Sequence, residues 1–109
     1  MKFEEGNLFM LDIKKQQDNK TLTVSLIGDL DTITSPNLEA SLSESLEGIE
    51  HLVFDFSELN YISSAGLRVI LATQENMNKQ GKKMVIRNIS DEIKKIFEVV
   101  GFIKFINIE

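Results

Sequence analysis

Apolar residues follow two different spacings that alternate along the chain, and this alternation restricts the possible folds more than any other feature of the sequence. Two segments with an apolar residue at every second position come first, over residues 8–15 and 21–29, and the polar residues between them indicate a β-hairpin. Segments with helical spacing and short strand-like segments then alternate to the end of the chain. Because a strand, a helix and a further strand in succession form a right-handed crossover between parallel strands, the sequence predicts an α/β fold with a mainly parallel sheet.

Three helices and three further strands are expected after the hairpin. The helices are expected over residues 34–48, 63–81 and 90–101, and the strands over residues 51–56, 82–88 and 102–108. Ser35 is expected to cap the first helix, since the fixed φ angle of Pro36 suits the first helical position and Gly48 follows the last turn. Residues 57–61, with the sequence SELNY, are expected to form a short loop before the second helix.

The composition of the chain excludes several classes of function. The 109 residues fit a single domain, which we expect to span residues 1–109. A net charge of −5 argues against binding to nucleic acid or to an anionic membrane, because both require a basic surface. The chain has no cysteine, which excludes thiol chemistry, and its first residues contain no continuous apolar run of the kind found in signal peptides. We therefore expect a cytoplasmic domain.

Few residues are equipped for catalysis or for metal binding. His51 is the one histidine, and no Gly-x-Ser-x-Gly motif surrounds Ser64, so a serine hydrolase is not indicated. Asp29 and Asp31 point the same way along an extended segment and could take part in a Mg²⁺ site, but a polar turn at a strand end is the simpler interpretation. The chain also lacks a glycine-rich phosphate loop. We therefore predict a protein that is not an enzyme and has no catalytic residue, metal or cofactor.

Two adjacent serines stand at the start of the second expected helix, in the stretch YISSAGLRVIL. Functional sites of open α/β folds lie at the carboxyl edge of the sheet, so Ser63 and Ser64 are candidates for a site there. One serine can cap the helix, and capping does not explain why a second serine stands beside it. Ala65 and Gly66 are small and are expected to leave the start of the helix open to a large group. The alternative is that they let the helix start pack tightly against the sheet.

Three longer stretches resemble the bacterial anti-sigma factor antagonists, the STAS domain family. They are GDLDTITSPNLEASL, HLVFDFSELNYISSAGLRVIL and GKKMVIRNISDEIKKIFEVVGFIKFINI, and the similarity extends over about residues 8–108. The resemblance implies a STAS-type fold, in which βα units build the sheet and the helices pack mostly on one face. It also implies a binding module rather than an enzyme. In this family the unmodified protein binds an anti-sigma factor that is also a serine kinase, and so frees a sigma factor.

The same resemblance implies a phosphorylation switch and a partner surface. Aligned on Gly66 and Leu67, the phosphorylated serine of the family corresponds to Ser64, with Ser63 as the alternative acceptor. Phosphorylation would end binding to the kinase, and a serine phosphatase would restore it. The partner-binding residues expected on this basis are Asp29, Asp31, Thr32, Ser63, Ser64, Ala65, Gly66 and Arg68. The alternative is a STAS-like adaptor, or a subunit of a larger assembly, that is never phosphorylated.

Overall fold

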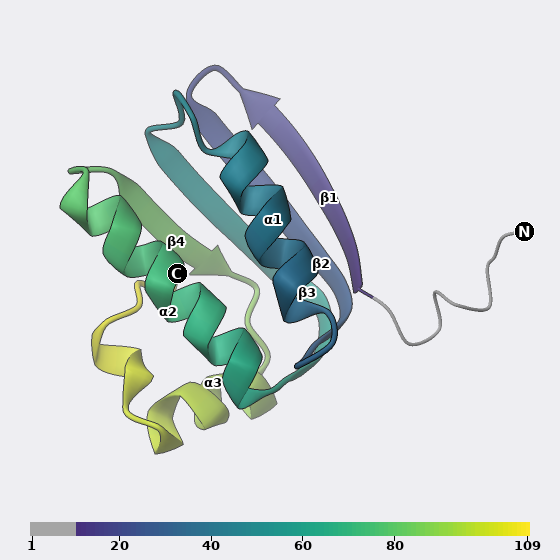
Figure 1. The fold of residues 1–109 in the computed structure, drawn as a ribbon. Coiled ribbons are helices and arrows are strands. Elements are labelled where there is room, and N and C mark those ends of the chain that lie inside the picture. Colours follow the sequence, from purple (N-terminus) through teal and green to yellow (C-terminus); the bar gives the residue numbers. More distant parts are fainter. Residues whose placement is uncertain (1–10) are drawn as a thin grey trace, which may run out of the picture.

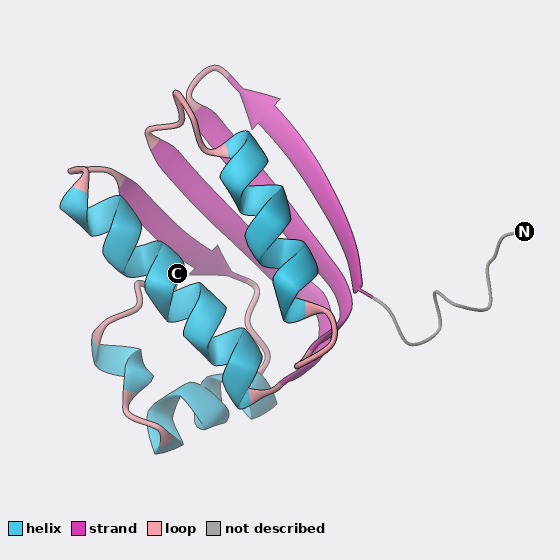
Figure 2. Cartoon of the chain, viewed as in Figure 1, coloured by secondary structure: helices cyan, strands magenta, loops and turns pink. Residues whose placement is uncertain are grey.

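A four-stranded sheet in the order β1-β2-β3-β4 forms the centre of the computed structural model, which describes residues 11–109 (Figures 1 and 2). The strands are β1 (Leu11–Asp18), β2 (Thr21–Leu30), β3 (His51–Ile62) and β4 (Lys83–Arg87). Strand β1 runs antiparallel to β2, whereas β2, β3 and β4 are parallel to one another. The expected hairpin and mainly parallel sheet are therefore confirmed, and the part of the first expected strand before residue 11 lies outside the described residues.

Two helices cover one face of this sheet. They are α1 (Ser35–Ser45) and α2 (Ser64–Lys79), which lie side by side in front of the strands in Figure 1. A third helix, α3 (Asp91–Val99), follows β4 and precedes a short 3₁₀ helix, η2 (Phe102–Lys104). The prediction that most helices pack on one face is confirmed. Within the part of the chain that the structure describes, no helix is long and apolar enough to cross a membrane.

The apolar residues behind the sequence pattern form one hydrophobic cluster between the sheet and the helices. Alternate residues of β2 point into it, as a strand with one buried face requires, and the helices contribute residues three or four positions apart. Its members include Val24, Leu26 and Leu30 of β2, Leu38 and Leu42 of α1, Leu67, Ile70 and Met77 of α2, and Ile93 and Phe97 of α3. Burial of these side chains fixes which face of each helix packs on the sheet and which face points to solvent.

The helix caps differ from the expected ones at a single place. Thr34, rather than Ser35, is the N-cap residue of α1, and Ser35 is the first helical residue. The side chain of Thr34 takes no part in capping the helix, because its hydroxyl is bonded within the preceding turn instead. At α3 the expected cap is confirmed, since Ser90 Oγ accepts a hydrogen bond from the N–H of Ile93 at 3.2 Å.

The predicted loop over residues 57–61 is wrong, because these residues continue β3 as far as Ile62. Two irregularities of register make the strand hard to recognise, and each gives β3 one residue more than β2. The first lies between Ser25 and Ile27, and the second follows Gly28, whose φ angle of 114° is one that glycine adopts readily. The longer β3 brings the strand directly to the start of α2.

The predicted strand over residues 102–108 is also wrong. Its first residues form η2, and the chain then touches β4 through one isolated bridge between Ile86 and Ile108. Phe102 and Ile103 are both partly buried and Ile106 is buried. That spacing matches a helical turn rather than the alternation of a strand.

Candidate functional site

The end of β2 and the start of α2 meet at the carboxyl edge of the sheet. Leu30 is aligned with Ile62 in the parallel pairing of β2 with β3, and the Leu30 carbonyl accepts a hydrogen bond from the N–H of Ser63 at 2.9 Å. The turn from Asp31 to Thr34 follows directly after Leu30. The structure thus brings together the two segments in which the sequence placed the partner-binding residues.

The two serines at the start of α2 have different roles. Ser63 is the N-cap residue: its backbone is extended, and its Oγ accepts a hydrogen bond from the N–H of Gly66 at 3.3 Å. Ser64 is the first residue of the helix, and its side chain is exposed to solvent. The capping task is therefore met by one serine, and the hydroxyl of the other stays accessible.

Gly66 is buried against the sheet, which confirms the alternative that the helix start packs tightly there and not the expectation that this residue leaves it open. A Cβ atom at this position would lie 2.7 Å from the carbonyl oxygen of Leu30 and 2.9 Å from Cγ1 of Ile62. Such distances are too short for any side chain, so only glycine allows α2 to approach β2 and β3 this closely. Gly66 sets the position of the helix start and offers no side chain to a partner.

Asp31 builds the turn between β2 and α1. Its Oδ1 accepts hydrogen bonds from the N–H groups of Ile33 at 2.9 Å and Thr34 at 3.0 Å. The hydroxyl of Thr34 accepts from the N–H of Asp31 and donates to the carbonyl of Asp29. The bond from the Thr34 N–H is the main reason why the pKa of Asp31 is lowered from its ordinary value of 3.8. Asp31 therefore has a local structural task, whatever it contacts on a partner.

The recognised contacts of Asp29 and Asp31 belong to a turn. Oδ1 of Asp31 is used by the turn, and Asp29 contributes its carbonyl to the same turn. Among residues 11–109, no three histidine, cysteine, aspartate or glutamate side chains gather in a way that could hold a metal ion. The arrangement matches the polar turn that was the simpler interpretation of the two aspartates.

Two exposed apolar residues near Ser64 were missed by the sequence reasoning. Ile33, in the turn before α1, is 76% exposed, and Tyr61, near the end of β3, is 52% exposed. Asp29 and Tyr61 are paired in register, so both apolar residues lie at the same edge as the serines. A sequence signal existed for Ile33, because it is a large apolar residue inside a polar turn. Because Ile33 and Tyr61 both lie at the edge that carries Ser64, they are candidates for contact with a partner.

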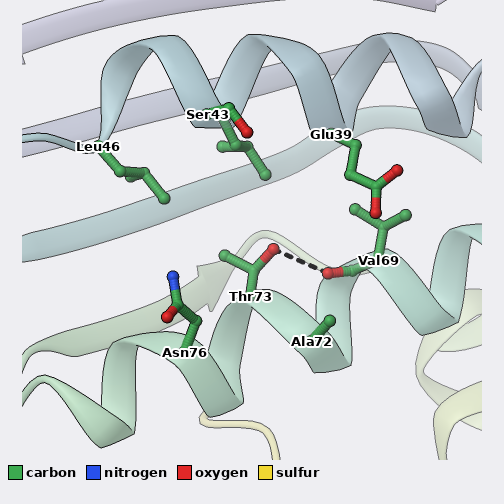
Figure 3. Close-up of a pocket in the computed structure, with 8 residues that line it drawn as sticks. Glu39, Ser43, Leu46, Val69, Ala72, Thr73 and Asn76 are labelled. Atoms are coloured by element: carbon green, nitrogen blue, oxygen red, sulfur yellow. Dashed lines mark hydrogen bonds between the residues drawn. The ribbon is translucent and has the colours of Figure 1, made fainter.

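A groove runs between α1 and α2 and opens beside the start of α2. Figure 3 shows one part of it, where Glu39 and Ser43 of α1 and Leu46, just after α1, face Val69, Thr73 and Asn76 of α2. This part has a volume of about 280 Å³, and a second part of about 380 Å³ continues toward Ser64. The second part is lined by Thr32, Ser35, Pro36, Glu39, Ala65, Arg68, Val69 and Ala72. Three of the expected partner-binding residues, Thr32, Ala65 and Arg68, therefore border one depression.

We expect Asp31→Ala to destabilise the protein at neutral pH and to lose much of this effect in acid. Folding lowers the pKa of Asp31, so its carboxylate contributes stability above the unfolded-state pKa, and the contribution is lost as the pH falls through the folded-state value. The measurement is the urea midpoint of both proteins, from neutral pH to below 3.8. Asp31→Asn keeps an oxygen acceptor and is the matched control. Equal midpoints for wild type and Asp31→Ala at neutral pH would contradict the assigned role.

The chain matches the family model of the STAS domain over residues 12–109. An anti-sigma-B factor antagonist of Staphylococcus aureus is 29% identical over 92 residues, which cover 84% of this chain and 85% of that protein.

Solved structures share the fold at lower sequence identity. An anti-sigma factor antagonist from Mycobacterium paratuberculosis superposes with a TM-score of 0.80 at 21% identity, over 90% of this chain and 84% of that chain. SpoIIAA of Bacillus in its phosphorylated form gives a TM-score of 0.72 at 17% identity, over 90% and 91% of the two chains.

Proposed function

The chain belongs to the STAS domain family, and we propose that it acts as an anti-sigma factor antagonist whose binding is switched by phosphorylation of Ser64. In its unmodified form, the single domain of residues 1–109 binds an anti-sigma factor that is also a serine kinase. This binding releases a sigma factor. The module works in the cytoplasm, where ATP and the kinase are present. The Staphylococcus aureus relative, an anti-sigma-B factor antagonist, supports the antagonist part of this proposal.

The exposed hydroxyl of Ser64 is the observation that carries the proposal. A phosphoacceptor must reach the terminal phosphate of ATP held in another protein, so it has to lie at the surface on a segment that a kinase can approach. Ser64 is exposed, whereas Ser63 is partly buried and its oxygen is occupied by the N–H of Gly66. The fold is also similar to that of SpoIIAA in its phosphorylated form.

The modification is a transfer of one phosphoryl group. The Ser64 oxygen attacks the γ-phosphorus of ATP, the bond from that phosphorus to the β–γ bridging oxygen breaks, and ADP leaves. The hydroxyl proton passes to a base or to water in the kinase site, since the described residues place no histidine beside Ser64. A phosphatase reverses the change by adding water across the O–P bond, which restores the hydroxyl and releases inorganic phosphate.

The phosphate acts on the partner surface rather than on the fold. It adds a charge of about −1.5 to −2 at the first residue of α2, where the helix dipole and free N–H groups accommodate an anion. The added charge joins Asp29, Asp31 and Glu39 near the same edge, and the phosphate also adds bulk. A loss of about 3 kcal/mol in binding free energy reduces affinity by roughly a hundredfold. Such a change separates the two proteins without refolding either one.

The proposed partner surface extends over three neighbouring segments. The side chains of the turn before α1, the exposed Tyr61 and the first turns of α2 lie at one edge of the sheet. The surface comprises Asp29, Asp31, Thr32, Ile33, Tyr61, Ser63, Ser64, Ala65 and Arg68. Gly66 contributes by setting the position of the helix and not by contact.

A second candidate function is that of a STAS-like subunit in a larger assembly, in which Ser64 is never phosphorylated. The observation in its favour is a set of exposed apolar residues on α3 and the segment after it. Val99 is 79% exposed and Phe105 is 63% exposed, and Val100 lies between them in the chain. Their elements are separate from those that carry Ser64.

Phosphosite mapping tests the proposed switch. The purified protein is incubated with the anti-sigma kinase of the same genome and ATP, and the phosphorylated residue is located by mass spectrometry. We expect one phosphate, on Ser64, because that hydroxyl is the accessible one. Ser63→Ala should be phosphorylated like the wild type, and Ser64→Ala should not be phosphorylated.

Two outcomes would overturn this assignment. If neither serine accepts phosphate, the chain fits the second candidate function. If the phosphate is found on Ser63 and persists in Ser64→Ala, the phosphoacceptor is Ser63 and the assignment to Ser64 is wrong.

A further inference from the structure

Arg68 lies four residues after Ser64 on α2, and both side chains are exposed. Residues at positions i and i+4 of a helix are neighbours on its surface, with Cβ atoms about 5–6 Å apart. Helical side chains also lean toward the N-terminus, so a long side chain covers the turn before its own Cα atom. The guanidinium of Arg68 can therefore reach the position that a phosphate on Ser64 would occupy.

The surroundings of Arg68 leave its guanidinium available for such a contact. Arg68 lines the groove together with Ala65 and Thr32, which are small, and with Glu39 from α1. Within residues 11–109, an ion pair joins Arg87 to Glu109, and no ion pair involves Arg68. The planar fork of a guanidinium presents donors that match the oxygens of a phosphate in a bidentate contact.

On the basis of the function proposed above, we propose that Arg68 binds the phosphate of phosphorylated Ser64 within the same helix. The pair then lies over the mouth of the groove, between Ala65 and Thr32. Phosphorylation changes the partner surface twice: it adds the phosphate, and it withdraws the Arg68 guanidinium from any carboxylate of the partner. The contact also keeps the phosphate in one place instead of letting it turn away from the surface.

The geometry makes this contact specific for Ser64. Ser63 precedes the helix and is five positions from Arg68, so its side chain does not lie on the same surface row. Its oxygen is also turned toward the N–H of Gly66. A phosphate on Ser63 would disrupt the cap of α2 and would not lie within reach of the Arg68 guanidinium.

The test is a ³¹P NMR titration of the full chain with phosphoserine incorporated at position 64 during translation. The second pKa of a phosphoserine is about 6 in the absence of partners. A guanidinium that binds the dianion lowers this pKa, so we expect Arg68→Gln to raise it by about half a unit relative to the chain with Arg68. Arg68→Lys, which keeps the charge without the planar fork, should give an intermediate value.

A control variant separates an effect at the start of α2 from a change in the net charge of the protein. Lys79→Gln removes one positive charge from the other end of the same helix. At a rise of about 1.5 Å per residue, that end lies more than 20 Å from position 64. This variant should leave the phosphate pKa unchanged. The carboxylates nearest the site, Asp29, Asp31 and Glu39, are retained in every variant. The proposal is overturned if Arg68→Gln leaves the phosphate pKa unchanged, or if Lys79→Gln shifts it equally.

The titration and the kinase assay can fail independently. The phosphate is installed without the kinase, so a missing shift in Arg68→Gln argues against the Arg68 contact alone. A kinase that leaves Ser64 unmodified argues against the proposed switch, while the titration still reports the geometry at the start of α2.

Discussion

Replacing Ser64 with aspartate is expected to weaken binding of the anti-sigma factor by roughly 10- to 100-fold, while the melting temperature stays nearly unchanged. The carboxylate places negative charge where Asp29, Asp31 and Glu39 already make the edge acidic. It does not strain the fold, because the side chain at this position is exposed and the first turn of a helix favours an anion. Calorimetric titration gives the affinity, and thermal unfolding followed by circular dichroism gives the melting temperature.

Two serine variants control this experiment. Ser64→Ala should keep the fold and bind the anti-sigma factor as tightly as the wild type, and ATP should no longer release the complex. Ser63→Ala should lower the melting temperature, because it removes the cap of α2 at a cost of about 1 kcal/mol. A large drop in melting temperature for Ser64→Asp would show that position 64 is needed for the fold and would contradict the assigned roles.

Gly66→Ala is expected to destabilise the protein by about 2–3 kcal/mol, although alanine is a better helix former than glycine by about 1 kcal/mol. The added Cβ would lie 2.7 Å from a carbonyl oxygen of Leu30, a backbone atom that cannot turn aside as a side-chain end can. The helix start has to move away from β2 and β3, and this loosens the packing beneath it. The free energy of unfolding in urea measures the loss.

Ser64→Ala is the matched control for Gly66→Ala, because it changes a residue of the same helical turn that faces solvent. It should alter the free energy of unfolding by less than about 0.5 kcal/mol. If Gly66→Ala is as stable as the wild type, the close approach of α2 to the sheet does not depend on glycine. The exposure of Ser64 would then need another explanation.

The helices could be predicted from the sequence because their signals are local. Leu38 and Leu42 stand one turn apart and face the sheet, and Ser90 caps α3 as its position before two acidic residues suggests. The N-cap of α1 was placed one residue late. The reason is that Asp31 and Thr34 use their side chains to close the preceding turn, a pairing that depends on the geometry at the end of β2.

The two wrong assignments involve strands, where the pattern depends on pairing. In β3 the buried residues after Phe56 are Leu59 and Ile62, so the spacing is three rather than two. Two register irregularities against β2 cause this spacing, and they cannot be read from β3 alone. At the C-terminus, Phe102 and Ile103 are adjacent apolar residues that fit either a strand or a helical turn.

The candidate site could be predicted in part. Its location at the carboxyl edge follows from the order of the elements, and the presence of a cap follows from two adjacent serines. Which serine caps and which is exposed depends on where α2 begins, and the packing of Gly66 against Leu30 determines that. The exposure of Ile33 and Tyr61 depends on the turn and the irregular pairing, which are features of the folded chain.

Comparing the full chain with and without phosphoserine at position 64, in calorimetric titrations against the purified anti-sigma factor, is the most direct test of the switch. We predict that phosphoserine lowers the affinity by roughly a hundredfold, and that circular dichroism and the melting temperature of the chain stay as they were. The same affinity for both forms, or a loss of affinity that comes with unfolding, would contradict a switch that acts through charge on an exposed hydroxyl.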